Sequence, residues 1–336
     1  EGQEKWLLDL AGLGTLSDMV PLRGENRMLG YFGLRVMRRG RRPGLKALMD
    51  ILRIRPSTLT EDDVAFMLTP RINAASRMDN PSAAAELLAT TDGAQAIVLA
   101  RALNKINDER KGLVAATVKE ANKRLAQSTL SPIIVLGSPA WRPGILGLVA
   151  NSLMEAHGRP AFVWGKEGGD TIRGSCRSAS VNIVELMCAA KDAFEEYGGH
   201  TASGGFSVSQ EKIHDLPQKL AAAYEAVSGE DAVQKELIVD RELSLAEVRG
   251  TYKDLQKLAP FGIGNEKPLF IFPNTSITSA RMFGKQQNHL EFGLESNGAR
   301  SSGIAFFSTQ ESFTKKAAPG TRADVVGNVE LDWRGS

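Results

Sequence analysis

Apolar and polar residues alternate with helical spacing through the first 90 residues, and turns separate the runs. Apolar side chains recur every three or four positions at Tyr31, Leu34 and Met37, and again at Leu45, Leu48, Met49 and Leu52. This spacing places apolar side chains on one face of a helix. We therefore expect this part of the chain to consist of helices.

A longer helical run follows Asp92. Apolar positions keep the same spacing from Ala96 to Leu125, and no Pro interrupts them. Asp92 precedes the run and is a residue type that caps helix N-termini by accepting backbone N–H bonds. The pattern predicts one connecting helix within residues 92–128, about 45 to 50 Å long at the usual rise per residue.

Short apolar runs then alternate with helical runs from residue 129 onward. The expected strands are 133–138, 160–165, 171–178 and 203–209, and the expected helices are 145–158, 181–198 and 211–228. Strands that alternate with helices indicate a sheet covered by helices. We expect an α/β domain over residues 129–229.

The last hundred residues contain short runs rich in β-branched and aromatic residues. The expected strands are 236–243, 268–284, 289–296, 299–308 and 323–333, with a helix and loop over 253–265. This pattern is typical of a small β-barrel. Because the last run lies close to Ser336, we expect that the barrel is incomplete.

Composition narrows the class of protein. The chain has 336 residues, of which 42% are apolar and 24% charged, as in globular proteins with more than one core. No uncharged apolar run is long enough to predict a membrane span. Two cysteines are too few for a disulfide scaffold, which favours a cytoplasmic location. Because Glu1 is not an initiator Met, we expect that it is not the natural start of the protein.

Positive charge is concentrated near the start of the chain. The net charge is +2, yet residues 23–55 hold ten Lys or Arg and two acidic residues. Cations in the run 35–46 could contact a phosphate backbone. Charge alone favours the simpler interpretation, in which they are solvated at a helix end and loop.

Four segments carry residue types that suit phosphate or metal chemistry. They are LAGLGTLSDMVPL (10–22), TPRINAASRMDNPSAAAELL (69–88), WRPGILGLVANSL (141–153) with RGSCRS (173–178), and EYGGHTASGGFSV (196–208). Carboxylate oxygens bind hard divalent cations, and arginine binds phosphate oxygens through two parallel hydrogen bonds. Taken singly, each segment has an ordinary structural explanation, such as a helix cap or a core aromatic residue.

Together and in this order, the four segments resemble the RecJ family of the DHH phosphodiesterase superfamily. The resemblance implies a multi-domain α/β fold: the helical C-terminal part of a DHH catalytic domain (1–91), a long connecting helix (92–128), an α/β DHH-associated substrate-binding domain (129–229), and an OB-like β-barrel domain that binds nucleic acid (236–336). The segment APFGIGNEKPLF (259–270) resembles the family segment that enters the OB-like domain.

The resemblance also implies roles for individual residues. Asp18, after a Gly-Thr turn, corresponds to a catalytic metal ligand, and His200 to a catalytic residue that contacts a phosphate. The implied substrate-binding residues are Arg71, Asn73, Arg77, Trp141, Ser175, Arg177, Gly198, Gly199 and His200. Ser175 and Arg177 would bind the 5′-phosphate, and Trp141 would stack on a base. Ser76 and Cys176 stand where the family usually has Gly. In the OB-like part, the candidates are Arg281, Phe283, Lys285 and Phe292.

The implied activity is that of a single-stranded-DNA-specific exonuclease that works in the 5′ to 3′ direction in DNA repair and recombination. Two Mn²⁺ or Mg²⁺ ions would activate water and stabilise the attacked phosphodiester. The implied partners are single-stranded DNA, a single-strand-binding protein and a helicase. The Asp-His-His triplet of the superfamily does not occur in these 336 residues. We therefore expect weak Mn²⁺ binding and no appreciable nuclease activity from this chain alone.

Three alternatives remain open at this point. The chain could come from a related DHH phosphodiesterase that acts on short oligonucleotides or cyclic dinucleotides. It could also be a non-catalytic nucleic-acid-binding module with the same fold. The related domain of alanyl-tRNA synthetases fits residues 130–228 and leaves residues 12–79 unexplained.

Overall fold

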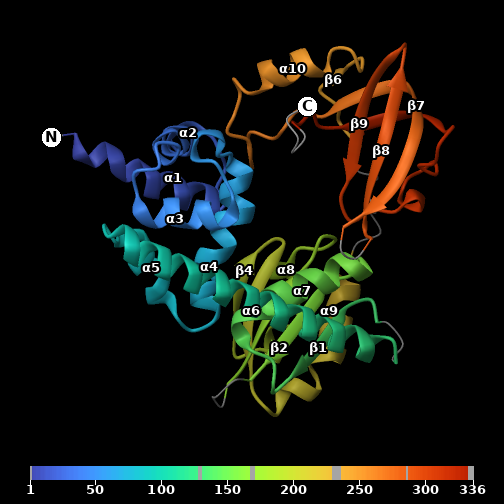
Figure 1. Cartoon of the computed structure of the whole chain (residues 1–336). Helices are drawn as coiled ribbons and strands as arrows, with labels where there is room; N and C mark the ends of the chain where they lie inside the picture. Colours follow the sequence, from blue (N-terminus) through green and yellow to red (C-terminus); the bar gives the residue numbers. More distant parts are fainter. Residues whose placement is uncertain (1, 128–130, 167–170, 229–235, 285–286, 332–336) are drawn as a thin grey trace. The chain divides into compact units, whose positions relative to one another are not determined.

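The computed structural model describes residues 2–127, 131–166, 171–228, 236–284 and 287–331, and it divides into two compact units (Figure 1). The first unit contains Glu1–Val36 and Gln234–Ser336, and the second contains Met37–Val233. Each unit buries apolar side chains of its own. Among the described residues, no helix is both long and apolar enough to cross a membrane.

The first unit combines N-terminal helices with a C-terminal sheet. It begins with η1 (Gln3–Leu7), α1 (Leu8–Ser17) and α2 (Gly24–Met37, of which residues to Val36 belong here). The backbone N–H of Leu22 donates to the carbonyl oxygen of Ile263 at 2.6 Å, and Arg27 Nη2 donates to the carbonyl oxygen of Leu258 at 2.6 Å. These bonds join segments that lie more than 200 positions apart in the sequence.

The sheet of the first unit curls into a half-barrel. Its elements are β6 (Arg241–Glu242), α10 (Val248–Leu255), β7 (Phe270–Phe283), β8 (His289–Ser296), β9 (Ala299–Ala305), η6 (Gln310–Ser312) and β10 (Arg322–Gly327). The described strands follow the order β10-β7-β8-β9, and β6 pairs with β7. The expected barrel is therefore open between β9 and β10 in the described residues. The strand expected over 236–243 is reduced to two residues.

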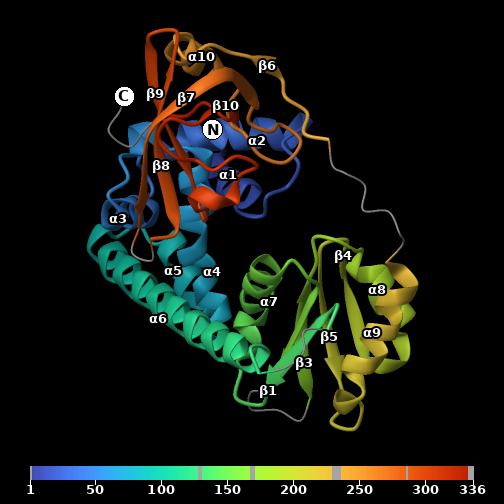
Figure 2. The same ribbon diagram turned by 90° about the vertical axis from the view of Figure 1, so that its right-hand side faces the viewer.

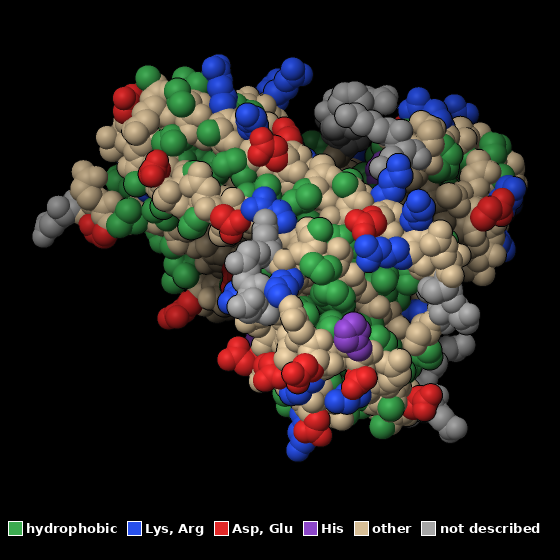
Figure 3. Space-filling view, turned by 90° about the horizontal axis from the view of Figure 1, so that it is seen from below, with side chains coloured by type: hydrophobic (Ala, Val, Ile, Leu, Met, Phe, Trp, Pro, Cys, Tyr) green, Lys and Arg blue, Asp and Glu red, His purple; other side chains and the backbone are tan. Residues whose placement is uncertain are grey.

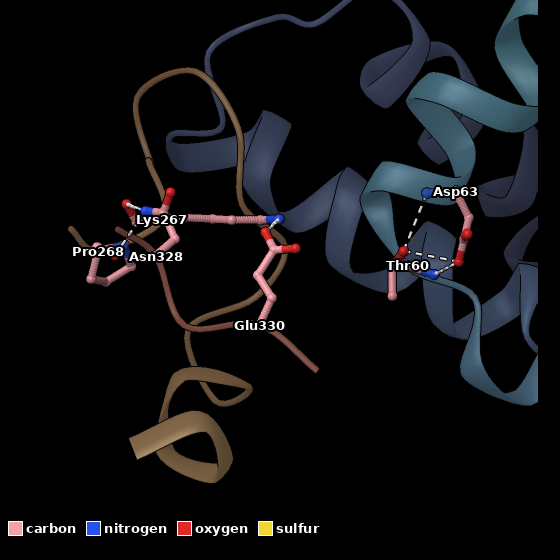
Figure 4. A network of polar contacts seen from close by, with 6 residues as sticks. All are labelled: Thr60, Asp63, Lys267, Pro268, Asn328 and Glu330. Atoms are coloured by element: carbon pink, nitrogen blue, oxygen red, sulfur yellow. Dashed lines mark hydrogen bonds and ion pairs between the residues drawn. The ribbon is translucent and has the colours of Figure 1, made fainter. Parts of the chain in front are cut away.

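Polar contacts brace both units (Figure 4). At the edge of the half-barrel, Lys267 Nζ pairs with the carboxylate of Glu330, and Asn328 Nδ2 donates to the carbonyl oxygen of Pro268 at 2.9 Å. In the second unit, Asp63 Oδ2 accepts from the backbone N–H and the hydroxyl of Thr60, both at 2.9 Å. This pair closes the first turn of a helix, as a cap does.

The helices expected before residue 91 are present in the second unit as well. They are α3 (Pro43–Leu52), η2 (Pro56–Thr58), the π-helical segment η3 (Asp63–Leu68), α4 (Thr69–Arg77) and α5 (Pro81–Ala89). Pro70 lacks a backbone N–H, and the wider π-turn before it is closed by the Thr69 hydroxyl, which donates to the carbonyl oxygen of Val64 at 2.7 Å.

The long helix is confirmed as α6 (Gly93–Leu125), with 33 residues. Its N-cap is Asp92, whose side chain accepts from the backbone N–H groups of Ala94 and Gln95. All of α6 belongs to the second unit. Its buried face includes Ala100 and Leu103, and also the polar residue Asn107.

A five-stranded sheet forms the other part of the second unit. Its strands are β1 (Ile134–Ser138), β2 (Ala161–Gly165), β3 (Ile172–Arg177), β4 (Glu196–His200) and β5 (Ser203–Val208), in the order β1-β2-β3-β5-β4. Helix α7 (Pro143–His157) covers one face, and α8 (Ile183–Ala189) and α9 (Leu216–Val227) cover the other (Figure 2). Short 3₁₀ turns η4 (Lys191–Ala193) and η5 (Lys212–His214) precede β4 and α9.

The expectation of one helix over 181–198 was wrong. Helix α8 ends at Ala189, and Glu196–His200 forms the edge strand β4. Gly199 has φ +155°, and its backbone passes so close to β5 that a Cβ atom there would lie 2.3 Å from the carbonyl oxygen of Ser203. Pairing with β5 thus overrides the helical apolar spacing of this segment.

Candidate nucleic-acid interface

The strand register places several predicted site residues on the α7 face of the sheet. Ser175 is opposite Gly205, which is opposite Gly198, and Arg177 is opposite Ser203, which is opposite His200. Directly opposed residues point to the same face, and so do residues two apart on a strand. Arg177 and His200 therefore lie two strands apart, about 10 Å from backbone to backbone at the usual spacing.

Cys176 points to the opposite face of the sheet. It is fully buried in the core with Met187, Phe206 and the helices α8 and α9. Burial raises the pKa of the Cys176 thiol to about 12. A protonated, buried thiol is a poor nucleophile, so Cys176 contributes packing rather than chemistry.

Gly147 of α7 makes room for the polar side chains of β3. A Cβ atom at position 147 would lie 3.0 Å from Arg177 Nη2 and 3.7 Å from the Ser175 hydroxyl oxygen. The two polar groups therefore lie against the same turn of α7. Arg177 Nη1 also donates to the carbonyl oxygen of Cys176 at 2.8 Å, which holds the guanidinium along the strand.

The end of α4 packs directly on the start of α7. A Cβ atom at Gly144 would lie 2.3 Å from the carbonyl oxygen of Arg77, so glycine is needed there for packing. Arg142 Nη2 pairs with Asp79 Oδ2 at 2.8 Å, which further joins the two segments. The second and third sequence segments thus meet, although about 65 residues separate them.

Arginine side chains gather where these elements meet. Burial lowers the pKa of Arg77, and the nearby charge of Arg177 lowers it further. Burial also lowers the pKa of Arg110 on α6, as do the charges of Arg77 and Arg71. We call Arg71, Arg77, Arg110 and Arg177 the arginine cluster. Since guanidinium groups stay charged near neutral pH, like charges held together favour an anionic ligand.

Arg71 and Asn73, which precede Arg77 in the segment 69–88, differ in exposure. Arg71 is buried, and its Nη1 donates to the carbonyl oxygen of Met67 at 3.0 Å. Burial lowers the pKa of Arg71, whereas the charge of Asp108 raises it. Asn73 is exposed on α4. Ser76, in place of the family's usual Gly, is helical and donates to the carbonyl oxygen of Asn73 at 3.2 Å.

The loop after His200 is tied to the loop after Arg177. The backbone N–H of Ser178 donates to the carbonyl oxygen of Ala202 at 3.0 Å, and the N–H of Ile183 donates to that of Thr201 at 2.8 Å. His200 is exposed. At Gly198, no described atom lies within 4 Å of the place that a Cβ would occupy. The surface beside His200 is therefore open to a ligand backbone.

The structure does not support base stacking by Trp141. This side chain is only 3% exposed and belongs to the core that α7 forms with β1 and β2. Its indole Nε1 donates to Glu120 Oε2 at 3.0 Å, and the guanidinium of Arg124 lies 5.3 Å from its ring centroid. Trp141 is thus a core residue with a satisfied polar atom.

Asp18 belongs to the first unit, whereas the predicted residues from Arg71 to His200 belong to the second. It is exposed and follows α1 directly, with its backbone N–H donating to the carbonyl oxygen of Gly14 at 3.0 Å. Gly14 and Thr15 lie inside α1, so the expected Gly-Thr turn before Asp18 was wrong. Among the described residues, no group of three His, Cys, Asp or Glu could hold a metal ion. These residues do not make a complete metal site by themselves.

Most cations of the basic N-terminal run have partners within the protein. Arg38 Nε donates to the carbonyl oxygen of Leu59 at 2.8 Å, Arg42 Nη1 to that of Leu88 at 2.7 Å, and Lys46 pairs with Asp50 at 2.7 Å. On the face shown in Figure 3, cationic and acidic side chains are interspersed. Broad surface charge is therefore a weaker indication of anion binding than the arginine cluster.

The candidate DNA-binding residues of the half-barrel have different surroundings. Arg281 pairs with Glu291, and the Phe283 ring lies 5.3 Å from that of His289. Phe292 is half-buried, and Lys285 lies outside the described residues. The sequence interpretation missed Phe306 and Phe307, which are 63% and 81% exposed. Their position at the end of an apolar strand run was the available signal.

Arg110 and Asn107 were also missed. The available signal was a series of polar residues, Asn104, Asn107 and Arg110, at the three-residue spacing of a face that also carries Ala100 and Leu103. Polar residues at core positions of a helix require partners or a function.

Comparisons with known proteins agree with this architecture. Residues 130–228 match the model of the DHHA1 domain, and residues 239–336 match that of the RecJ OB domain. Together these segments make up more than half of the chain.

Full-length relatives extend the similarity. The single-stranded-DNA-specific exonuclease RecJ of Bacillus subtilis is 30% identical over 333 residues, which cover 97% of this chain and 42% of that protein. Crystal structures of RecJ from Thermus thermophilus in complex with Mg²⁺ and with Mn²⁺ superpose with TM-scores of 0.77 and 0.78, at 28% and 29% identity. They match 97% of this chain, which covers 52% and 49% of theirs. The chain thus spans about half the length of the relatives it matches.

Proposed function

The chain belongs to the RecJ family, and on that basis we propose that it provides the single-stranded-DNA-binding part of a metal-dependent 5′ to 3′ exonuclease. The full protein would hydrolyse phosphodiester bonds in DNA repair and recombination. The relatives' name as single-stranded-DNA-specific exonucleases supports the substrate class. The arginine cluster supports the location of the phosphate path.

One observation carries this proposal. Arg77 and Arg177 come from segments 100 positions apart, and packing of α4 on α7 places their charges close together. Such an arrangement is costly unless an anion is bound, and the charges then strengthen its binding. A DNA strand supplies several neighbouring phosphates, so it suits a group of arginines.

The site residues take roles along this path. Arg177 and the Ser175 hydroxyl bind the 5′-phosphate, and Arg77, Arg71 and Asn73 contact phosphates near it. His200, beside the open position at Gly198, hydrogen-bonds a neighbouring phosphate from the edge strand, and Gly199 lets this strand lie close against β5. A histidine at such a position can donate from either ring nitrogen, depending on its tautomer.

Divalent metal ions complete the activity that we propose for the full protein. Mg²⁺ or Mn²⁺ would supply a polarised water and charge stabilisation at the phosphate. Asp18 would be one oxygen ligand, and the described residues hold no group of three His, Cys, Asp or Glu that could complete the site. We therefore expect this chain alone to bind Mn²⁺ weakly and to show no appreciable nuclease activity. The same observation favours a second candidate function, a non-catalytic DNA-binding module, for the isolated chain.

A location in the cytoplasm and interactions with a single-strand-binding protein and a helicase complete the proposal. They follow from the family's place in DNA repair.

Binding of labelled oligonucleotides tests the proposed site. Fluorescence anisotropy would compare a 5′-phosphorylated dT12 with the same strand lacking the phosphate. For the unaltered chain, we expect the phosphorylated strand to bind several-fold more tightly. Arg177→Ala should weaken its binding by about 10- to 100-fold and remove the preference, because charge-assisted hydrogen bonds are lost. Equal affinity of Arg177→Ala and the unaltered chain for both strands would refute the assignment.

A further inference from the structure

Helix α6 carries polar residues on the side that packs against α4. Arg71 Nε donates to Asn104 Oδ1 at 3.3 Å, which fixes which side of α6 faces α4. Asn107 neighbours Asn104 at a spacing of three residues, and Arg110 neighbours Asn107 at the same spacing. The charges of Arg71 and Arg77 on α4 act on Arg110, which places it near α4 as well. The proposed phosphate-binding roles above use neither Asn107 nor Arg110.

Both residues hold buried polar atoms without a hydrogen-bond partner in the described structure. Asn107 is fully buried, and neither its Oδ1 nor its Nδ2 has a partner there. The same is true of Arg110 Nε. Leaving a buried polar atom unsatisfied costs about 1 to 3 kcal/mol, and folded proteins contain few of them. Three such atoms within one helical turn indicate a function that requires them.

The charges that act most strongly on Arg110 are of its own sign. Arg71 and Arg77 act on it across the α4–α6 contact. On α6 itself, the neighbouring acids are engaged elsewhere: Glu109 pairs with Lys105 at 3.9 Å, and Asp108 accepts from Asn104 Nδ2 at 3.2 Å. No described ion pair or hydrogen bond links Arg110 to a carboxylate. Arg110 therefore retains its capacity to bind an anion.

We propose that Arg110 binds a phosphodiester group of the DNA strand adjacent to the phosphates held by Arg77 and Arg177, and that Asn107 is its positioning residue. When Arg110 turns its Nη groups to the phosphate, Asn107 Oδ1, one turn away, accepts a hydrogen bond from its Nε. This fixes the guanidinium plane for bidentate binding. The inference rests on the proposed function, because it requires that a nucleic-acid strand passes the arginine cluster.

Arg110 variants test the phosphate contact. With dT12, Arg110→Ala should weaken binding about tenfold and reduce the slope of log affinity against log salt by about 0.7, the value for one phosphate contact on a single strand. Because the contact is internal, the loss should be equal with and without a 5′-phosphate. Arg110→Lys should keep the salt slope and recover part of the affinity, since it retains the charge and loses the planar fork. Lys105→Ala, an exposed cation on the same helix, is the matched control and should stay within twofold.

Asn107→Leu tests the positioning role. It removes both unsatisfied atoms at similar volume, so denaturant unfolding should show unchanged or higher stability. Binding should nevertheless weaken three- to tenfold, and the double variant with Arg110→Ala should bind like Arg110→Ala alone. Lower stability with unchanged affinity, or additive losses in the double variant, would refute the positioning role.

Arg177→Ala separates the two levels of the proposal. If it weakens binding and Arg110→Ala does not, the inference about Arg110 fails and the proposed function stands. If neither variant weakens binding, the proposed phosphate path itself fails. A loss in Arg110→Ala that depends on the 5′-phosphate would contradict an internal contact.

Discussion

Arginines on the half-barrel and arginines of the cluster occupy opposite electrostatic environments. On the half-barrel, Arg281 is opposite Glu291 across β7 and β8, and Arg300 is opposite Glu295 across β8 and β9. Both arginines form ion pairs with these partners. In the cluster, the strongest electrostatic neighbours of Arg77 and Arg110 are other arginines.

The difference separates cations that stabilise a fold from cations that await a ligand. A carboxylate at the opposed position neutralises an arginine within the sheet, and the exposed pair contributes less than about 1 kcal/mol. Asp108 acts on Arg71, but the charges that act most on Arg77 and Arg110 are those of other arginines, which leaves positive charge that an anion can balance. Composition does not distinguish the two cases, because both use the same residue type.

Reversing one charge in each region should have the largest effect. Arg77→Glu should weaken dT12 binding by at least about 100-fold, because a favourable contact becomes repulsive. Its unfolding free energy should not fall, since like-charge repulsion is relieved. Arg300→Glu should change binding less than fivefold and slightly lower stability, because it faces Glu295. Similar binding losses in both variants, measured by anisotropy, would erase the distinction.

The packing that assembles the cluster can be tested at Gly144. Gly144→Ala should lower the unfolding free energy by about 1 to 3 kcal/mol, since the added methyl meets the Arg77 carbonyl oxygen. Gly112→Ala on α6 is the control: no atom lies within 4 Å of its Cβ position, so it should raise stability by about 1 kcal/mol through helix propensity. Urea unfolding of both variants measures this, and a stable Gly144→Ala would remove the packing argument.

The buried thiol of Cys176 on β3 should make the stability of the protein depend on pH. The folded-state pKa of Cys176 is about 12, against 9.0 for an ordinary thiol. Between these values the unfolded thiol loses its proton and the folded one keeps it, so stability should fall by about 1.4 kcal/mol per pH unit. Cys176→Val should remove this pH dependence. The measurement is the unfolding free energy of the unaltered chain and of the variant between pH 8 and 11, where the difference between the two should change with pH. Iodoacetamide at pH 8 should label exposed Cys188 and spare Cys176.

Freeing a paired cation should have the smallest effect. Glu291→Gln leaves Arg281 without its ion-pair partner at the opposed position. Affinity for dT12 should rise less than threefold, and the salt slope should steepen by at most about 0.7. Stability should change by less than about 1 kcal/mol. A tenfold gain would show that the pair, rather than the lack of a strand path, limits binding at the half-barrel.

Much of the fold was accessible from local patterns. The α6 helix and its Asp92 cap, the strands β1, β2, β3 and β5, and most of the half-barrel strands follow from periodicity. Residues 190–198 of the expected helix were misjudged because their helical apolar spacing is overridden by pairing between β4 and β5. The turn expected before Asp18 is part of α1. Glycine disfavours a helix only modestly, so Gly14 does not end it.

For the site, the sequence by itself determined which residue types were available: Arg77 and Arg177 in motifs that resemble a nuclease family, and His200 between glycines. Only the tertiary structure decided which of them meet. Strand register set Arg177 and His200 on one face, packing at Gly144 and Gly147 brought Arg77 to Arg177, and burial removed Trp141 from the surface. The physical reason is range: periodicity and capping act over a few residues, whereas the charge of one arginine acts on another through space that distant segments must first bring together.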